Sequence, residues 1–228
     1  MPETNTQFIP YEDMLKAGMH FGRKKTVFNP GMGNYVFSVR DGICIIDLLK
    51  TQDLLNQSIA FLKEVKEGGG LILCMAPTKQ SRDGVLQLAQ AMGMPYVLDR
   101  WLGGTLTNFK IINTRVKRLE EMEQQKASDA LDKYTKKERL LFDRELEKMK
   151  KSFEGLKKLT RIPDVLFVAS LKDGALPIHE ARRMGVRIIA IANTDASPEG
   201  VQYVIPANDR SKKSIDLIVD AIQKALTA

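Results

Sequence analysis

Two kinds of hydrophobic pattern alternate along most of the chain. Short apolar runs, such as residues 71–76, have no polar position, which predicts strands buried on both faces of a parallel sheet. Between them, apolar side chains recur every three or four residues, as in helices that pack one face against a sheet. The expected strands are 35–39, 43–48, 71–76, 96–98, 165–169, 187–192 and 203–205, and the expected helices are 51–67, 78–92, 175–184 and 211–226. This alternation predicts an α/β sandwich with a mostly parallel sheet.

Turn-forming residues separate these segments. Asp41-Gly42 stands between two β-rich runs and predicts a hairpin. Thr78 is the expected N-cap of the helix 78–92, and Gly93 and Gly185 follow predicted helices at the position where glycine ends them.

Residues 105–160 break the alternation, because they contain no buried strand and are rich in charge. Their apolar positions are spaced by three and four residues, which is the pattern of a coiled-coil seam. These positions are Ile112, Val116, Leu119 and Met122, then Phe142, Leu146, Met149, Phe153 and Leu156. We expect an inserted antiparallel helical hairpin at 105–160, with helices extending ~27 Å, on a sheet domain formed by 1–104 and 161–228.

Charge narrows the range of functions. The 228 residues hold 35 Lys and Arg against 28 Asp and Glu, a net charge of +7. Residues 110–160 have 15 basic and 10 acidic side chains, so 15 − 10 = +5 of that excess lies there. A basic excess concentrated in this way favours a polyanionic partner, although a solvated helical face is the alternative for each lysine.

Composition and the N-terminal residues narrow the location. The content of 43% hydrophobic residues, with 16 Gly and 9 Pro, is that of a globular protein. Cys44 and Cys74 lie in apolar runs, which favours a reducing compartment over a disulfide framework. The apolar runs are too short for membrane spans, and residues 1–7 lack the features of a signal peptide, so we expect a cytoplasmic protein with no membrane partner.

Motifs for catalysis, cofactors or metals are weak. The tip at 76–81 is neither a dinucleotide-binding nor a Walker loop, and no nucleophile has an evident base. His20 with Asp195 offers a cation site across the strand ends, but a hydrogen-bonded structural histidine is favoured. The amides of residues 103–105 offer an anion site, and a flexible turn beside Trp101 explains the glycines equally well. We therefore expect no enzyme activity, no cofactor, no metal and no small-molecule substrate.

Basic residues beside aromatic ones and on the first hairpin helix fit RNA better. A basic segment with interleaved aromatics can follow an irregular RNA backbone and stack on bases. The predicted phosphate contacts are Arg23, Lys24, Lys25, Lys79, Arg100, Lys110, Arg115, Lys117 and Arg118. Arg210, Lys212 and Lys213 open the last helix, where cations oppose its dipole and an anionic partner would explain them. We expect Trp101 to be a core anchor for the Gly103-Gly104 turn and not a base-stacking platform.

Several strings resemble the S2 family of bacterial small-subunit ribosomal proteins over essentially the whole chain. The most specific is RWLGGTLTNF at 100–109, and the others match in order and spacing. They are LKAGMHFG at 15–22, NP at 29–30, GI at 42–43, IIDL at 45–48, KT at 50–51, TKKE at 135–138, RELEK at 144–148, PD at 163–164 and IPAND at 205–209.

This resemblance implies a flavodoxin-like sheet domain with a protruding helical hairpin, and no enzymatic activity. It implies binding of ribosomal RNA near the head–body junction of the small subunit, and recruitment of the large mRNA-binding ribosomal protein. The family usually has a second histidine where Arg23 stands, so a cation site built on that pair is not expected. Pro77-Thr78-Lys79 and Ala207-Asn208-Asp209 replace the family's Gly-Thr-Lys and Gly-Asn-Asp.

Two other functions compete with a ribosomal one. A sugar-phosphate or nucleotide-binding enzyme of flavodoxin-like fold would seat a small anion on the amides of residues 103–105. A protein–protein adaptor would use the hairpin, and this overlaps the ribosomal function because ribosomal proteins also have protein neighbours.

Overall fold

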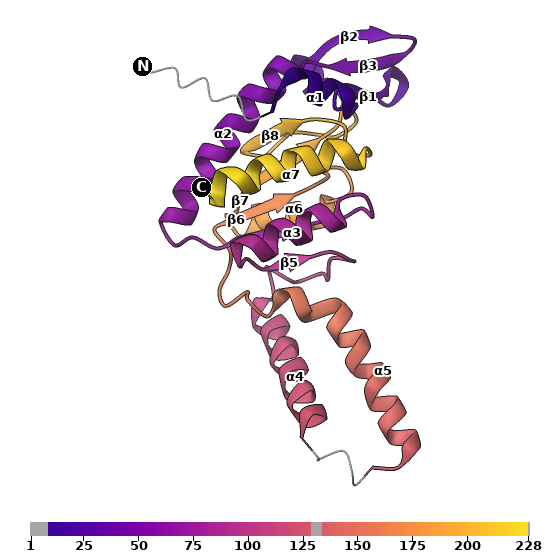
Figure 1. The fold of residues 1–228 in the computed structure, drawn as a ribbon, viewed down its shortest axis with the longest axis vertical. Coiled ribbons are helices and arrows are strands. Elements are labelled where there is room, and N and C mark those ends of the chain that lie inside the picture. Colours follow the sequence, from indigo (N-terminus) through magenta and orange to yellow (C-terminus); the bar gives the residue numbers. More distant parts are fainter. Residues whose placement is uncertain (1–8, 129–133, 228) are drawn as a thin grey trace.

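The computed structural model describes residues 9–128 and 134–227 (Figure 1). The strands are β1 (Phe21–Lys24), β2 (Val36–Arg40), β3 (Ile43–Ile46), β4 (Ile72–Met75), β5 (Tyr96–Val97), β6 (Val165–Val168), β7 (Arg187–Ala192) and β8 (Tyr203–Pro206). The α-helices are α1 (Tyr11–Lys16), α2 (Leu48–Glu67), α3 (Arg82–Met92), α4 (Phe109–Ala127), α5 (Lys136–Phe153), α6 (Ala175–Arg183) and α7 (Lys212–Thr227). Short 3-10 helices are η1 (Lys25–Val27), η2 (Pro30–Tyr35) and η4 (Glu154–Leu156).

A five-stranded parallel sheet forms the body, in the order β5-β4-β6-β7-β8. Its first strand in the chain, β4, has the second, β5, on one side and the remaining three on the other. This is the strand order of flavodoxin-like folds, in which the direction of winding reverses beside the first strand. The predicted fold class is therefore confirmed.

Both faces of this sheet are buried, which explains why its strands show no polar alternation. Successive side chains of a strand point to opposite faces, and here they enter two separate cores. Cys74 and Phe167 pack with α2, α3 and α7, while Leu73 and Leu166 pack with α6 and the start of α4. In Figure 1, α7 and α3 lie across the near face of the sheet.

A three-stranded antiparallel sheet, β1-β3-β2, lies at the opposite end of the molecule from α4 and α5 (Figure 1). The connection between β2 and β3 is the predicted hairpin. Asp41 and Gly42 both have positive φ, 49° and 74°, as a two-residue turn matched to the strand twist requires.

Helices α4 and α5 run side by side away from the β5 edge of the body (Figure 1). Among the described residues, the side chains buried between them are Leu119, Met122 and Leu146. At the base of the hairpin, Ile112 and Leu156 are buried in one of the two cores of the body. The predicted domain boundaries at 105 and 160 therefore stay a prediction.

Two predicted helix starts need correction. Thr78 is not an N-cap, because α3 begins at Arg82 with Ser81 before it, and the Thr78 hydroxyl lies 3.0 Å from that of Ser81. Helix α2 begins three residues earlier than predicted, since the Asp47 carboxylate accepts a hydrogen bond from the Leu49 amide at 3.1 Å and caps the helix. Over the two described ranges, no helix combines the length and apolar character needed to cross a membrane.

Candidate nucleic-acid interface

The loop after β5 is organised around one buried carboxylate. Glu180 of α6 is 4% exposed and accepts hydrogen bonds from Trp101 Nε1 at 3.0 Å, the Gly104 amide at 2.8 Å and the Leu106 amide at 2.9 Å. The amide and hydroxyl of Thr107 also donate to it, at 3.3 and 3.4 Å. We call this set of contacts the Glu180 latch.

The latch corrects one interpretation of the glycine turn and confirms another. Of the amides of residues 103–105, which offered a site for a small anion, that of Gly104 donates to Glu180 and that of Thr105 donates to the Leu102 carbonyl oxygen at 3.1 Å, so two of the three are already bonded within the chain. Trp101, at 5% exposure, is the predicted core anchor. Burial raises the pKa of Glu180, but the hydrogen bonds from Leu106, Trp101, Gly104 and Thr107 outweigh it and hold that pKa below its ordinary value.

The latch also positions two elements that carry basic side chains. Arg100 directly precedes the anchored Trp101, and α4 begins at Phe109, two residues after the last amide that donates to Glu180. The sequence string that is most diagnostic of the family thus joins the sheet to the hairpin.

The carboxyl ends of β6, β7 and β8, where flavodoxin-like folds place ligands, are held together by buried polar groups. The Asp209 carboxylate accepts from the Ser170 hydroxyl at 2.7 Å and from Asn193 Nδ2 at 3.1 Å. The Thr194 hydroxyl accepts from the Arg23 amide at 2.8 Å, which ties β1 to the same edge. These side chains bind each other and stabilise the loops of the edge.

Asp195 and His20 do not form a cation site together. The Asp195 side chain is 4% exposed and pairs with Lys172 at 2.8 Å and with Arg23 at 3.5 Å. The prediction of a hydrogen-bonded His20 is wrong at one atom, since its Nδ1 is buried without a partner and burial lowers the pKa of the ring. The ring packs against Phe21 at 4.0 Å between centroids. No group of three metal-ligating side chains occurs in the described ranges.

The predicted phosphate contacts fall into three groups. Lys24 and Lys25 are exposed on β1 and η1, and Arg23 beside them is half-buried in its ion pair. Lys79 and Arg100 are exposed after β4 and β5, at the carboxyl edge of the sheet. These residues lie on the body.

The third group lies on α4. At 3.6 residues per turn, Lys110 and Lys117 share one face, and Arg115 and Arg118 share the neighbouring face; all are exposed. Arg118 lies 3.5 Å from Glu121. Among the described residues, the other three have no carboxylate within ion-pair distance.

Sequence reasoning assigned no RNA contacts to α5, yet four of its exposed cations follow one another at spacings of seven, four and three residues. They are Lys137, Arg144, Lys148 and Lys151. This spacing can be read from the sequence. It was overlooked because the apolar positions of the same helix have the same period and explained its pattern.

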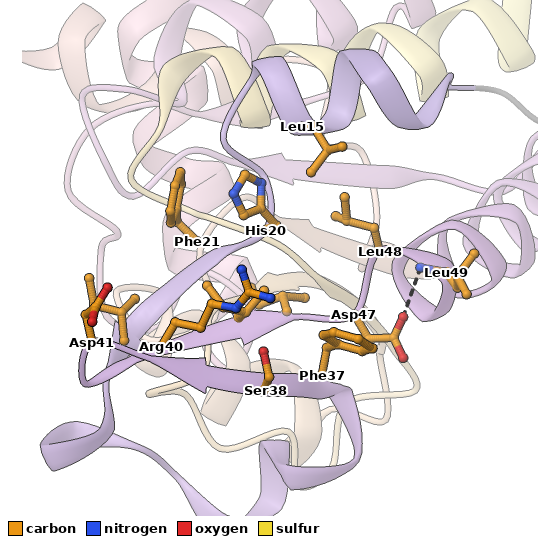
Figure 2. A pocket seen from close by; sticks show the side chains of 13 residues that line it. Leu15, His20, Phe21, Phe37, Ser38, Arg40, Asp41, Asp47, Leu48 and Leu49 are labelled. Carbon is orange, nitrogen blue, oxygen red and sulfur yellow. Dashed lines mark hydrogen bonds between the residues drawn. The ribbon is translucent and has the colours of Figure 1, made fainter.

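An apolar hollow of about 560 Å³ opens at the other end of the molecule, between α1, the antiparallel sheet and the start of α2. Figure 2 shows Leu15, His20, Phe21, Phe37 and Leu48 around a common space. Phe37 is 69% exposed, which is unusual for so large an apolar side chain and typical of a surface that a partner covers.

In this arrangement the side chains at the carboxyl ends of β6, β7 and β8 bind each other, and many cations are exposed. The family of the chain agrees with it. The sequence matches the family model of ribosomal protein S2 over residues 14–228, nearly its whole length, and the chain therefore belongs to the ribosomal protein S2 family.

Proposed function

We propose that this chain is a structural constituent of the small ribosomal subunit that binds ribosomal RNA with the cations of the body and the hairpin. One contrast carries the proposal. The amides of Gly104 and Thr105 are bonded to groups of the chain itself, whereas the side chains of Lys79, Arg100, Lys110 and Lys117 are exposed and form no ion pair among the described residues. The groups that remain available to an external anion are therefore these exposed cations. Membership of the family supports the same conclusion.

The chemistry of these side chains fits the RNA backbone. Lysine and arginine that contact phosphates orient a protein on nucleic acid without reading its bases. Such contacts release counterions, so binding weakens as salt rises. The nine sequence-predicted residues are the proposed phosphate contacts, with Arg23 acting chiefly through its pair with Asp195.

The proposed place of action is the head–body junction of the small subunit in the cytoplasm, as the resemblance implies. A non-enzymatic role follows from the family. The competing nucleotide-binding enzyme would need the amides of residues 103–105. Because Gly104 donates to Glu180 and Thr105 to the Leu102 carbonyl oxygen, it requires the loop after β5 to rearrange.

Sedimentation of a cell lysate through a density gradient tests the proposal. We expect the chain to migrate with the small subunit and with complete ribosomes, and to dissociate partly at high salt. A peak of free protein at both salt concentrations would overturn the ribosomal function. Substituting Lys24 and Lys25 together by alanine should weaken subunit binding with unchanged thermal stability, and Arg23 is left in place because it pairs with the buried Asp195 side chain.

The apolar hollow supports a protein neighbour as well as RNA. We propose that this surface contributes to recruiting the large mRNA-binding ribosomal protein, because exposed aromatic rings are enriched where proteins meet. Phe37→Ser should reduce retention of that protein on purified small subunits while the chain itself stays bound. Val27→Ser, at an exposed apolar residue outside the hollow, is the control. Equal retention in both variants would place the recruiting surface elsewhere.

A further inference from the structure

One face of α5 is a continuous row of cations that none of the internal contacts of the described chain uses. Its members, which we call the α5 track, are Lys137, Arg144, Lys148 and Lys151. From 3.6 residues per turn and 1.5 Å per residue, they lie within about 60° around the helix axis and extend ~21 Å along it.

The track points away from the rest of the hairpin. By the same geometry, Leu146, which is buried against α4, lies on the opposite side of α5. The track therefore contributes nothing to packing between the two helices, and its four side chains are exposed.

Neighbouring acids do not neutralise the track. Asp143 pairs with Lys126 at 2.6 Å, and the Glu138 carboxylate accepts from the Thr135 amide at 2.8 Å in the capping box of α5. Glu145 and Glu147 lie to either side, and among the described residues no carboxylate comes within 4.0 Å of a track cation.

Other cations of the hairpin differ in this respect. Lys150 and Lys157 both bind Glu123, at 3.3 and 2.7 Å. The side-chain hydrogen bond from Lys157, with a smaller one from Lys150, outweighs desolvation and lowers the pKa of Glu123. Cations that serve the fold thus have partners, and those of the track do not.

The track leads to a cleft beside the parallel sheet. Lys151 lines a hollow of about 380 Å³ together with Arg100, Tyr96 and Ser152. Asp99 in its wall is paired with Arg82, while Glu154 also lines it. Arg100, the exposed cation that precedes Trp101, therefore lines the same hollow as Lys151, the last residue of the track.

We propose that the α5 track and Arg100 form one phosphate-binding surface for the backbone of ribosomal RNA. The proposal rests on the proposed function and extends its hairpin contacts from α4 to α5. A row of like charges extending ~21 Å, without internal partners, complements a polyanionic strand, and each cation that binds a phosphate adds to the salt dependence of binding. Leu141, 54% exposed between Lys137 and Arg144, offers an apolar contact within the row.

Binding of the full chain to in vitro transcribed small-subunit ribosomal RNA, measured over a range of KCl concentrations, tests this assignment. The test variant is Arg144→Gln with Lys148→Gln and Lys151→Gln, since glutamine retains helix propensity. We expect roughly tenfold weaker binding, and a slope of log affinity against log salt that is smaller by about 2 to 3.

The control removes the same charge elsewhere. Lys63→Gln with Arg183→Gln and Lys224→Gln changes α2, α6 and α7 at residues without an ion pair in the described chain. It should leave affinity within about twofold, and both variants should melt at the wild-type temperature. Equal weakening in the two variants would show a diffuse charge effect and overturn the track.

Three other outcomes overturn the proposal in distinct ways. A wild-type chain that does not bind the RNA removes the proposed function together with the track. Wild-type binding that only Lys110→Gln with Arg115→Gln and Lys117→Gln weakens would place the contacts on α4. Loss of incorporation into subunits with RNA binding intact would identify an acidic protein as the partner of α5.

Discussion

The body and the hairpin of this chain are stabilised in different ways, and the difference separates stability from binding. In the body, a strand such as β6 is buried on both faces, so each of its side chains contributes to one of two cores. In the hairpin, Leu119, Met122 and Leu146 are the buried side chains of one narrow seam, and the outer faces of α4 and α5 carry charge. Because hydrophobic stabilisation is roughly proportional to the apolar area removed from water, the body should be the more stable part and should tolerate changes in the hairpin.

The joint between the two regions shows what connects them. The Glu180 latch holds the loop that leads into α4, and Gly155 of η4 packs against β5 on the return. A Cβ at Gly155 would lie 2.2 Å from the Tyr96 carbonyl oxygen, so only glycine allows this approach. Orientation of the hairpin therefore depends on contacts made in the body and not on the seam.

The largest effect is expected at the latch. Glu180→Ala leaves Trp101 Nε1 and the amides of Gly104 and Leu106 without their acceptor, and should lower the free energy of unfolding by about 3 kcal/mol. Urea unfolding followed by the fluorescence of Trp101, the one tryptophan, measures it. His179→Ala, at the exposed neighbouring residue, should have little effect. A small loss for Glu180→Ala would mean that the loop holds its shape by apolar packing.

The pH dependence of the stabilisation by Glu180 follows from the sign of its pKa shift. The folded-state pKa of Glu180 lies below its unfolded value, so the stabilisation is complete above about pH 4.3 and is lost as the pH falls through the folded pKa. The stability difference between wild type and Glu180→Gln should therefore narrow below about pH 4. A difference that stays constant into acid would show that the charge is not what the amides recognise.

A smaller and more local effect is expected in the seam. Leu146→Ala removes a buried side chain from between α4 and α5 and should cost about 2 kcal/mol, a roughly thirtyfold faster amide exchange confined to the two helices. The melting temperature of the body should hardly change. Leu140→Ala, at an exposed leucine of the same helix, provides the control. Faster exchange in β4 and β6 as well would mean that body and hairpin unfold together.

The smallest effect is expected for an ion pair across the hairpin. Lys126 and Asp143 are 2.6 Å apart and about half exposed, so a double-mutant cycle should give a coupling energy of about 0.5 kcal/mol or less, reduced further by salt. A coupling several times larger would assign the alignment of α4 and α5 to charge instead of the seam.

Much of the fold could be predicted because its signals are local. Continuous apolar runs such as 71–76 identified buried parallel strands, Asp41-Gly42 identified a turn with positive φ, and Gly93 ended α3 in the left-handed region as expected. The Thr78 cap failed because capping depends on where the helix begins, and sequence alone places that within a few residues.

The candidate site was predictable in residue type but not in arrangement. Basic residues of α4 and the strand ends were identified. Paired and unpaired cations could not be told apart, since pairing depends on contacts between distant segments. Arg23 lies 172 positions from Asp195, yet the two form an ion pair. Nothing in the helical period of α5 distinguishes Lys150, which is paired, from Lys151, which is not.

The sequence by itself determined the parallel α/β architecture, the helical insertion and the family, because periodicity and motif strings lie within short stretches of chain. Only the tertiary structure decided that Glu180 accepts the Gly104 amide of the glycine turn and that the four cations of the α5 track form no ion pair among the described residues. The physical reason is that a hydrogen bond or ion pair forms only where folding brings donor and acceptor within about 3 to 4 Å. Such distances between α6 and the loop after β5 exist only in the folded chain.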